Sequence, residues 1–346
     1  MEATTVNIQD VATRAKVSIG TVSNVLNRPE MVSAPRRAKV EEAIAELGFV
    51  RNESARHLGT GQSRTMGFVV MDASNPFFID VARGAESTIR KAGRFLLTAN
   101  SQSNSAQERA YLGLFEQQRT GGVLVAPVGD VSESLARLKA RGVPAVIVDS
   151  PSPNDNFSSV QTDNVAGGRL AMEHLIATQR RTIDFVGGPL TMHQIEDRLT
   201  GARQALEASG RDPHAMRVWE AESSTEHAGR LIGHRIASLP EAIRPDGIIA
   251  TNDLLAMGLL HALVGYPNIR IPEDIAIIGY DDIAWAGSAV VPLSSIRQPS
   301  ELIGSTAAQI LLDESASPER EHSQLLFQPE LVTRESTATS RGRVTL

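Results

Sequence analysis

The sequence predicts a small all-α domain followed by a larger α/β core made of two doubly wound parallel-sheet lobes. Apolar residues recur at helical spacing within the first 51 residues. From residue 65 onward, short apolar strands alternate with amphipathic helices, and this alternation occurs as two separate sets. At 346 residues the chain is also too long for one hydrophobic core.

The segment from Ile8 to Leu26 contains two short amphipathic helices with a tight turn at Lys16-Val17. Ser18 is placed to cap the second helix through its hydroxyl. Two helices this short cannot bury a core alone, so a third is needed. The segment Ala34–Leu47 supplies it, with Ser33 as its predicted cap. This pattern predicts a helix-turn-helix, whose second helix enters the major groove of DNA.

The core begins at Thr65 with a first set of strands that read as buried and parallel, TMGFVVM, RFLLTAN, GGVLVAP and PAVIVDS. A second set contains TIDFVGG, MRVWEA, DGIIATN and AIIGYDD. Helices near 78–92, 105–118 and 131–141 separate the first strands. Ligands of such sheets bind beyond the carboxyl ends of the strands, which here places the ligand in a cleft between the lobes.

The composition narrows the class of protein. The chain has no cysteine, which excludes a disulfide framework and thiol catalysis and fits a reducing cytoplasm. No signal peptide and no apolar run of about 20 residues is visible. We therefore expect a cytoplasmic protein. The eight histidines have no ligand spacing, so we expect no metal site and no cofactor.

Charge is distributed unevenly along the chain. The net charge is −6, but residues 1–64 hold nine Lys and Arg against seven acidic residues, a net charge of +2. The remaining residues therefore carry −8. A basic end on an acidic body suits a protein that docks on DNA by one end only.

The motifs follow one another in an order that resembles the LacI/GalR family of repressors. The N-terminal motifs are DVATRAKVSIGTVSNVLN, VSAPRRAKVEEAIAELGFVRN and ESARHLG, and the core motifs are NPFF, VQTDNVAGG, DRLTGA, TNDLLAMG and IGYDD. The core also resembles the type I periplasmic sugar-binding fold. The resemblance implies a sequence-specific, DNA-binding transcriptional repressor of the bacterial, nucleoid-associated type. It further implies a homodimer on a palindromic operator, with a tetramer left open, and allosteric control by a small sugar-like effector.

The same resemblance implies the domain boundaries. The helix-turn-helix headpiece spans 1–51, a hinge helix and linker span 52–64, and the ligand-binding and dimerisation core spans 65–346. Within the core, the N-lobe would comprise about 65–160 and 293–323. The C-lobe would comprise 161–292 and 324–335, which leaves 336–346 as a mobile tail.

The resemblance also assigns residues that contact DNA. In the family, the pair matching Ile19-Gly20 reads bases, and these two residues favour methyl contact and close approach over bidentate hydrogen bonding. Leu58 would be wedged into the minor groove. Alternatively, Ile19 packs inside the headpiece and Leu58 belongs to an ordinary linker. The other expected contacts are Ser18, Thr21, Ser23 and Asn24 along the same helix side, Ser33 and Arg36 at phosphates, and Asn52 and Ala55 in the hinge.

Polar residues that follow the core strands form the predicted effector site. The pattern looks like the pentose-binding members of the fold, where carboxylates, an arginine and amides hydrogen-bond sugar hydroxyls while an aromatic ring stacks on the sugar. The predicted residues are Asn75, Phe78, Asp149, Arg198, Asn252, Asp281 and Gln298. Purely structural roles are also open: Asp281 and Asn252 could cap local structure, Arg198 could form a surface ion pair with Asp197, and Phe78 could belong to the core. Departures at Ala126, Ser150 and Ser224 leave the identity of the pentose open.

The sequence also admits other functions. The effector could be a non-sugar metabolite or a corepressor. A sugar-transport binding protein would explain the cleft, but it would not explain the headpiece. A sugar-active enzyme would need Asp281-Asp282 or Asp149 as acid and base, yet adjacent Asp residues at a strand end normally point apart. We therefore expect no enzymatic activity. The operator sequence, the regulated genes and the effector stay open.

Overall fold

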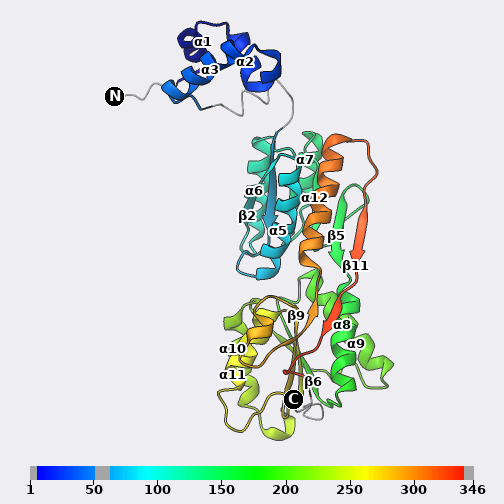
Figure 1. Cartoon of the computed structure of the whole chain (residues 1–346). Helices are drawn as coiled ribbons and strands as arrows, with labels where there is room; N and C mark the ends of the chain where they lie inside the picture. Colours follow the sequence, from blue (N-terminus) through cyan, green and yellow to red (C-terminus); the bar gives the residue numbers. More distant parts are fainter. Residues whose placement is uncertain (1–5, 51–62, 339–346) are drawn as a thin grey trace. The chain divides into compact units, whose positions relative to one another are not determined.

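The computed structural model describes residues 6–50 and 63–338 (Figure 1). The chain divides into two compact units, Met1–Ser63 and Arg64–Leu346. The first corresponds to the predicted headpiece with its linker, and the second to the predicted core.

The headpiece forms the predicted helix-turn-helix. Its elements are α1 (Ile8–Ala15), α2 (Ile19–Asn27), a 3-10 turn (Pro29–Met31) and α3 (Ala34–Leu47). Lys16 ends α1 in the left-handed conformation, with φ of 54°. The Ser18 side chain accepts a hydrogen bond from the backbone N–H of Thr21 at 3.2 Å, so the predicted cap of α2 is confirmed.

Each headpiece helix contributes a fully buried valine to one small core: Val11 from α1, Val22 from α2 and Val40 from α3. One prediction about α3 was wrong. Ser33 occupies the N-cap position, but its side chain makes no capping hydrogen bond. Pro35 lies in the first turn of α3, where a missing N–H costs nothing and the fixed φ favours the helix.

The N-lobe is a parallel sheet in the order β11-β5-β4-β3-β1-β2. Its strands are β1 (Thr65–Val70), β2 (Phe95–Asn100), β3 (Val123–Val125), β4 (Ala145–Val148), β5 (Ser158–Thr162) and β11 (Gln324–Phe327). Its helices are α5 (Pro76–Lys91), α6 (Ser105–Gln117), α7 (Ser132–Ala140) and α12 (Ser300–Ala316).

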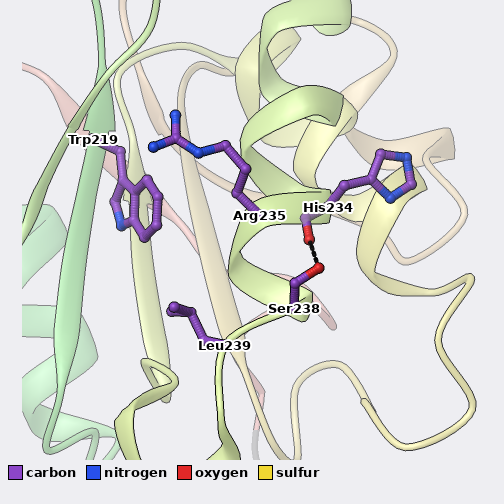
Figure 2. Close-up of a pocket in the computed structure, with 5 residues that line it drawn as sticks. All are labelled: Trp219, His234, Arg235, Ser238 and Leu239. Carbon is purple, nitrogen blue, oxygen red and sulfur yellow. Dashed lines mark hydrogen bonds between the residues drawn. The ribbon is translucent and has the colours of Figure 1, made fainter.

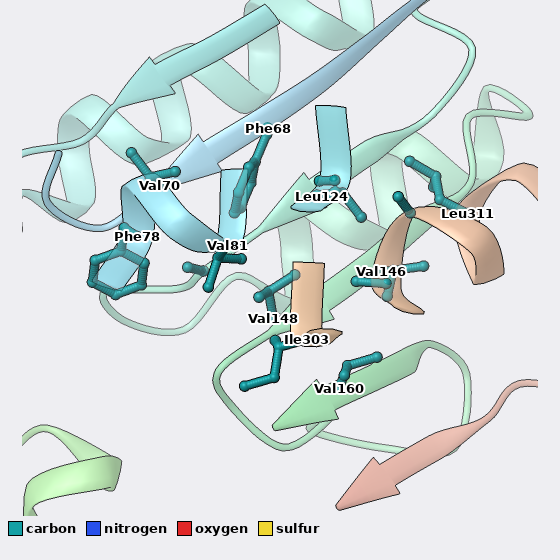
Figure 3. Packing of buried hydrophobic residues seen from close by; sticks show 14 of the residues in the cluster. Phe68, Val70, Phe78, Val81, Leu124, Val146, Val148, Val160, Ile303 and Leu311 are labelled. Atoms are coloured by element: carbon teal, nitrogen blue, oxygen red, sulfur yellow. The ribbon is translucent and has the colours of Figure 1, made fainter. Parts of the chain in front are cut away.

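Successive side chains of this sheet point to opposite faces and pack into two hydrophobic cores. Phe68 of β1 packs with Val81 of α5 and Ile303 of α12 (Figure 3). The next residue, Val69, belongs to the cluster that contains Phe115 of α6 and Leu135 of α7. Because strand side chains alternate, one strand anchors helices on both faces.

The strand β2 was predicted to be buried, and that was wrong. It lies at the edge of the sheet, and Phe95 and Leu97 are 60% and 55% exposed. The apolar run alone could not reveal this, because a strand's position in the sheet depends on its neighbours rather than on its own composition.

The C-lobe sheet has the order β12-β10-β9-β8-β6-β7, and β12 pairs antiparallel with β10. Its strands are β6 (Ile183–Gly187), β7 (Val218–Glu220), β8 (Gly247–Ala250), β9 (Ala276–Asp281), β10 (Ser294–Arg297) and β12 (Glu330–Val332). Its helices are α8 (Asn164–Ala177), α9 (His193–Ala208), α10 (Glu226–Ala237) and α11 (Asp253–Leu263), with 3-10 turns at Glu241–Ile243 and Ala286–Ser288. All eight strands predicted from the sequence are present.

The chain passes between the lobes slightly later than predicted. β5 extends the N-lobe sheet to Thr162, so the first crossing follows 160. β10 pairs with β9 of the C-lobe, which moves the second crossing from 292 to beyond Arg297. β11 pairs with β5 of the N-lobe, which moves the third from 323 to beyond Phe327. Each correction has the same cause: a strand's sheet is chosen by long-range pairing.

The predicted mobile tail begins too early. Ser336 and Thr337 are fully buried, and the Ser336 hydroxyl donates to the Ile277 carbonyl at 2.6 Å. These contacts attach the chain to the C-lobe through residue 337. Residues 339–346 lie outside the described part.

Candidate functional site

The outer side of α2 carries the residues predicted to contact bases. Ile19 is 43% exposed, so it does not pack inside the headpiece. Gly20 and Asn24 are exposed as well, while Thr21 and Ser23 are half-buried. Ser18 lies beside them, with its hydroxyl 3.0 Å from that of Thr21. The helix therefore presents an accessible apolar side chain beside bare backbone, as a groove-reading helix requires.

The predicted phosphate contacts lie at the start of α3. Ser33 and Arg36 are both exposed. The predicted hinge contacts Asn52, Ala55 and Leu58 lie outside the described residues.

In the core, the first predicted acid is Asp149, directly after β4. It is 4% exposed and has a left-handed backbone, with φ of 59°. Gln194, from the first turn of α9 in the other lobe, donates its amide to the Asp149 carbonyl at 2.8 Å and to Oδ2 at 3.2 Å. The second carboxylate oxygen, Oδ1, has no hydrogen-bond partner.

The second acid, Asp281, ends β9 and is 6% exposed, with φ of 103°. Its Oδ2 accepts a hydrogen bond from the Asn75 amide of the N-lobe at 3.1 Å. Its Oδ1 accepts one from the amide of Gln298, on the segment that crosses between lobes, at 2.8 Å. The structure thus brings three predicted residues together, Asn75, Asp281 and Gln298.

Arg198 of α9 supplies the positive charge. It is 6% exposed, and its Nε donates to Asn164 Oδ1 at 2.9 Å while Nη1 donates to the Thr251 carbonyl. The guanidinium lies 3.6 Å from the centre of the Tyr280 ring. Within the described residues, Arg198 forms no ion pair closer than 4 Å. Its suggested surface partner, Asp197, pairs instead with His193 at 3.0 Å.

Close helix packing fixes the backbone that carries Arg198. Gly168 of α8 lies so near α9 that an added Cβ would come within 1.9 Å of the Arg198 carbonyl oxygen. Gly201 of α9 meets the Val165 carbonyl of α8 in the same way. The paired glycines let the two helices touch along their backbones, which holds the guanidinium at the end of the sheet.

Burial perturbs both acids. Removal from water raises the pKa of Asp149 to about 7, since the favourable field of Arg198 only partly offsets the cost and Asp281 adds to it. Burial also raises the pKa of Asp281, against the opposing effects of Arg198 and the two amide donors. Two acids and one arginine therefore share a poorly hydrated space.

A pH dependence of stability follows from Asp149. Its folded-state pKa lies above the unfolded value, so the protonated form stabilises the fold below about pH 4, and this contribution is lost as pH rises to about 7. About three pKa units correspond to about 4 kcal/mol at most. We expect wild type to lose stability relative to Asp149→Asn over this window, measured by urea unfolding. A difference between the two proteins that stays constant with pH would contradict the assignment.

Two predicted residues have local structural roles. Asn252 caps α11 through Oδ1, which accepts from the Leu255 N–H at 2.9 Å, and its amide donates to the Ser224 carbonyl at 2.9 Å. This matches the alternative role as a cap. Phe78 is buried in the N-lobe core beside Val81 (Figure 3), with its ring centre 5.1 Å from that of Phe77. Stacking of Phe78 on a ligand stays a prediction.

Sequence reasoning missed three residues around Arg198: Gln194, Asn164 and Tyr280. Tyr280 was read as part of a buried strand. Gln194 lies in the first turn of α9, and Asn164 is the first residue of α8, just after the first crossing. Only the pairing of segments far apart in the chain reveals their role.

A separate hollow of about 450 Å³ lies on the C-lobe (Figure 2). It is lined by Trp219 of β7 and by Arg235, Ser238 and Leu239 at the end of α10, while His234 points away from the indole. The Trp219 indole N–H donates to the buried Asp184 at 2.7 Å. None of the predicted site residues lines this hollow.

Within residues 6–50 and 63–338, no group of three or more His, Asp or Glu side chains is placed to hold a metal ion. None of the helices in these ranges is long and apolar enough to cross a membrane.

Comparison with known proteins places this geometry in a family. Residues 7–52 match the bacterial regulatory proteins of the lacI family, and residues 172–337 match the periplasmic binding protein-like domain. The HTH-type transcriptional repressor PurR of Aliivibrio fischeri is 31% identical over 331 residues, which cover 95% of this chain and 97% of that protein.

Two solved structures are similar along most of their length. The lac repressor dimer bound to operator and the anti-inducer ONPF is 27% identical, covers 97% of this chain and 100% of its own, and has a TM-score of 0.83. A LacI family transcriptional regulator from Enterococcus faecium with bound ribose is 28% identical, covers 79% and 98%, and has a TM-score of 0.73. The chain is a DNA-binding transcriptional repressor that belongs to the lacI family of bacterial regulatory proteins.

Proposed function

We propose that this repressor binds a palindromic operator as a homodimer through α2, and that a small sugar-like effector controls its operator affinity. The effector binds between the two core lobes, at the cluster formed by Asp149, Arg198 and Asp281. The similar lac repressor was solved as a dimer on its operator, and the Enterococcus faecium regulator with ribose, which supports both halves of the proposal.

One observation supports the proposed effector site: its buried charged side chains are incompletely paired. Arg198, Asp149 and Asp281 are each less than 10% exposed, yet the arginine forms no ion pair with either acid. Buried charges are normally paired or fully hydrogen-bonded, because desolvation is costly. Asp149 Oδ1 and Gln298 Oε1 also lack hydrogen-bond partners. A ligand with several hydroxyl groups would supply those partners.

The effector acts by changing the position of one lobe relative to the other. Side-chain hydrogen bonds join the lobes. The Asn75 amide of the N-lobe donates to Asp281 of the C-lobe, and the Gln194 amide of the C-lobe donates to Asp149 of the N-lobe. A ligand that inserts at these contacts changes how the lobes meet. In a dimer this shift re-spaces the two headpieces and lowers operator affinity by the coupling free energy, typically about 1–3 kcal/mol.

A dimer on a palindrome should protect two symmetric half-sites in footprinting, and its affinity should fall steeply as salt rises. The operator is first obtained by selection from random DNA with the full chain. Full-affinity binding of one chain to a single asymmetric half-site would contradict the dimer.

Two headpiece substitutions separate base reading from phosphate contact. We expect Ile19→Ala to weaken selected operator about 10-fold while leaving random DNA nearly unaffected, because a methyl contact discriminates bases. Arg36→Ala should weaken both DNAs alike and reduce the salt dependence, because phosphate contacts carry no sequence information. Met31→Ala, at an exposed residue outside α2, is the control. Equal losses on both DNAs for Ile19→Ala would exclude its role in base reading.

A further inference from the structure

We propose that the C-terminal segment, residues 334–337, holds the effector residue Asp281 in place through an ion pair between Arg334 and Asp282. Arg334 acts through Asp282 rather than by touching the effector, which makes it a positioning residue. The inference rests on the proposed function and deepens it, because it gives the end of the chain a part in controlling the effector site.

The chain turns sharply after β9, at residues 281–283. Asp281 has φ of 103° and Asp282 has φ of 53°, so two successive residues with side chains lie in the left-handed region that favours glycine. Backbone of this kind persists only where the surrounding structure holds it. The direction of the Asp281 carboxylate, towards Asn75 and Gln298, therefore depends on what fixes this turn.

The backbone of the turn is held by side chains of the C-lobe. The Asp282 N–H donates to Ser295 Oγ at 3.0 Å, and the Ile283 N–H donates to Asp253 Oδ2 at 2.8 Å. The Ser295 hydroxyl in turn donates to Asp253 Oδ1 at 2.7 Å. These bonds constrain the residues after Asp281, and they depend on the turn keeping its position.

The side chain of the turn is held by charge. The Asp282 carboxylate lies 2.7 Å from Arg297 Nε and 2.7 Å from Arg334 Nη1. The Asp282 side chain is 5% exposed, that of Arg334 22% and that of Arg297 49%. Because water and salt screen exposed pairs, Arg334 makes the stronger contact. This contact is an ion pair without hydrogen-bond geometry, so it depends on charge more than on the shape of the guanidinium.

The C-terminal segment sets where Arg334 lies. The Arg334 N–H donates to Ser294 Oγ at 2.7 Å, and its Nη1 donates to the Leu293 carbonyl at 2.7 Å. The hydroxyl of Ser336 accepts from the Ser294 N–H at 2.8 Å, and that of Thr337 lies 2.7 Å from Ser294 Oγ. The segment is thus anchored at the start of β10 by buried polar groups, and Arg334 reaches from this anchor to the turn.

The two adjacent acids therefore differ in role. Asp281 accepts a hydrogen bond from Asn75 of the other lobe, whereas Asp282 pairs with arginines of its own lobe. The two acids share a peptide unit, so a shift of Asp282 rotates the backbone that carries Asp281. Loss of Arg334 should then displace a carboxylate that Arg334 does not contact.

The first experiment tests the turn without a ligand. Hydrogen exchange of the full chain, measured by mass spectrometry with residue-level fragmentation, is compared at the amides of Asp282 and Ile283. We expect exchange at least about 10-fold faster in Arg334→Met, with less than about 2-fold change in peptides from α9 and α10. Arg270→Met is the matched control, since Arg270 also lies 2.7 Å from an acid of the C-lobe, Asp274. Unchanged exchange at the turn, or equal acceleration throughout the C-lobe, overturns the inference.

The second experiment asks whether the turn controls binding. D-ribose, D-xylose and D-glucose are compared by thermal shift, and calorimetry measures Kd for the sugar with the largest shift. We expect Arg334→Met to raise this Kd at least about 10-fold, because a displaced carboxylate loses its hydrogen bonds to the sugar. Arg334→Lys keeps the charge and should stay within about 3-fold of wild type. Operator affinity without sugar should stay within about 3-fold in both variants, because the headpiece and the core are separate compact units.

An unchanged Kd in Arg334→Met overturns the positioning role, and an equal loss in Arg334→Lys overturns the ion pair as its cause. Sugar binding that Asp281→Ala abolishes and Arg334→Met leaves intact overturns this inference alone. A sugar that binds Asp281→Ala as tightly as wild type overturns the proposed site as well. If none of the three sugars binds wild type, the exchange experiment decides whether Arg334 holds the turn.

Discussion

Asp281→Ala is expected to weaken effector binding by about 2–4 kcal/mol, which is about 30- to 1,000-fold, because a buried carboxylate that accepts charge-assisted hydrogen bonds is lost. The carboxylate holds Asn75 from one lobe and Gln298 from the crossing segment, so its loss also releases both amides. The variant should therefore remain on operator DNA at effector concentrations that release wild type.

The measurement for Asp281→Ala is calorimetry with the neutral sugar that best stabilises wild type, followed by operator release monitored by fluorescence anisotropy. Asp184→Ala serves as the control, because it also removes a buried carboxylate from the C-lobe, and its effector affinity should stay within about 3-fold of wild type. Equal effector affinity in Asp281→Ala and wild type would remove Asp281 from the site.

Arg198→Leu is expected to destabilise the core by about 3–5 kcal/mol, since it removes the positive field that opposes the desolvation of two buried acids. It also removes the hydrogen bonds to Asn164 and Thr251 and the contact with the Tyr280 ring. Without the guanidinium, the pKa values of Asp149 and Asp281 should rise further. The loss of stability should therefore be larger at pH 8 than at pH 5.

Urea unfolding followed by tryptophan fluorescence measures this loss, because both tryptophans, Trp219 and Trp285, belong to the core. Arg169→Leu is the matched control. It removes an arginine from the neighbouring helix α8, where the partner Glu173 is 4.0 Å away and both side chains are exposed. Such a pair contributes less than about 1 kcal/mol. A comparable loss in the two variants would show that the cluster contributes nothing specific.

The sequence by itself determined the elements of this protein. The strands are short runs rich in apolar residues, so eight of them could be located from their own residues, although β2 proved to be an exposed edge strand. The helix-turn-helix depends on contacts within a few residues, such as Ser18 with Thr21, and its cap was predicted correctly. Local chemistry also offered a capping role for Asn252, and its Oδ1 does cap α11.

Only the tertiary structure decided which elements meet. The residues that form β10 and β11 belong to lobes other than those predicted for them, because their pairing partners lie far away in sequence. Asn75 and Asp281 are 206 residues apart, and Gln194 lies 45 residues from Asp149. The sequence pattern identifies Asp149 and Asp281 as candidate site residues. It does not show which side-chain amide donates a hydrogen bond to each of them, or which carboxylate oxygen lacks a partner. Those facts depend on how the two sheets of the core face each other.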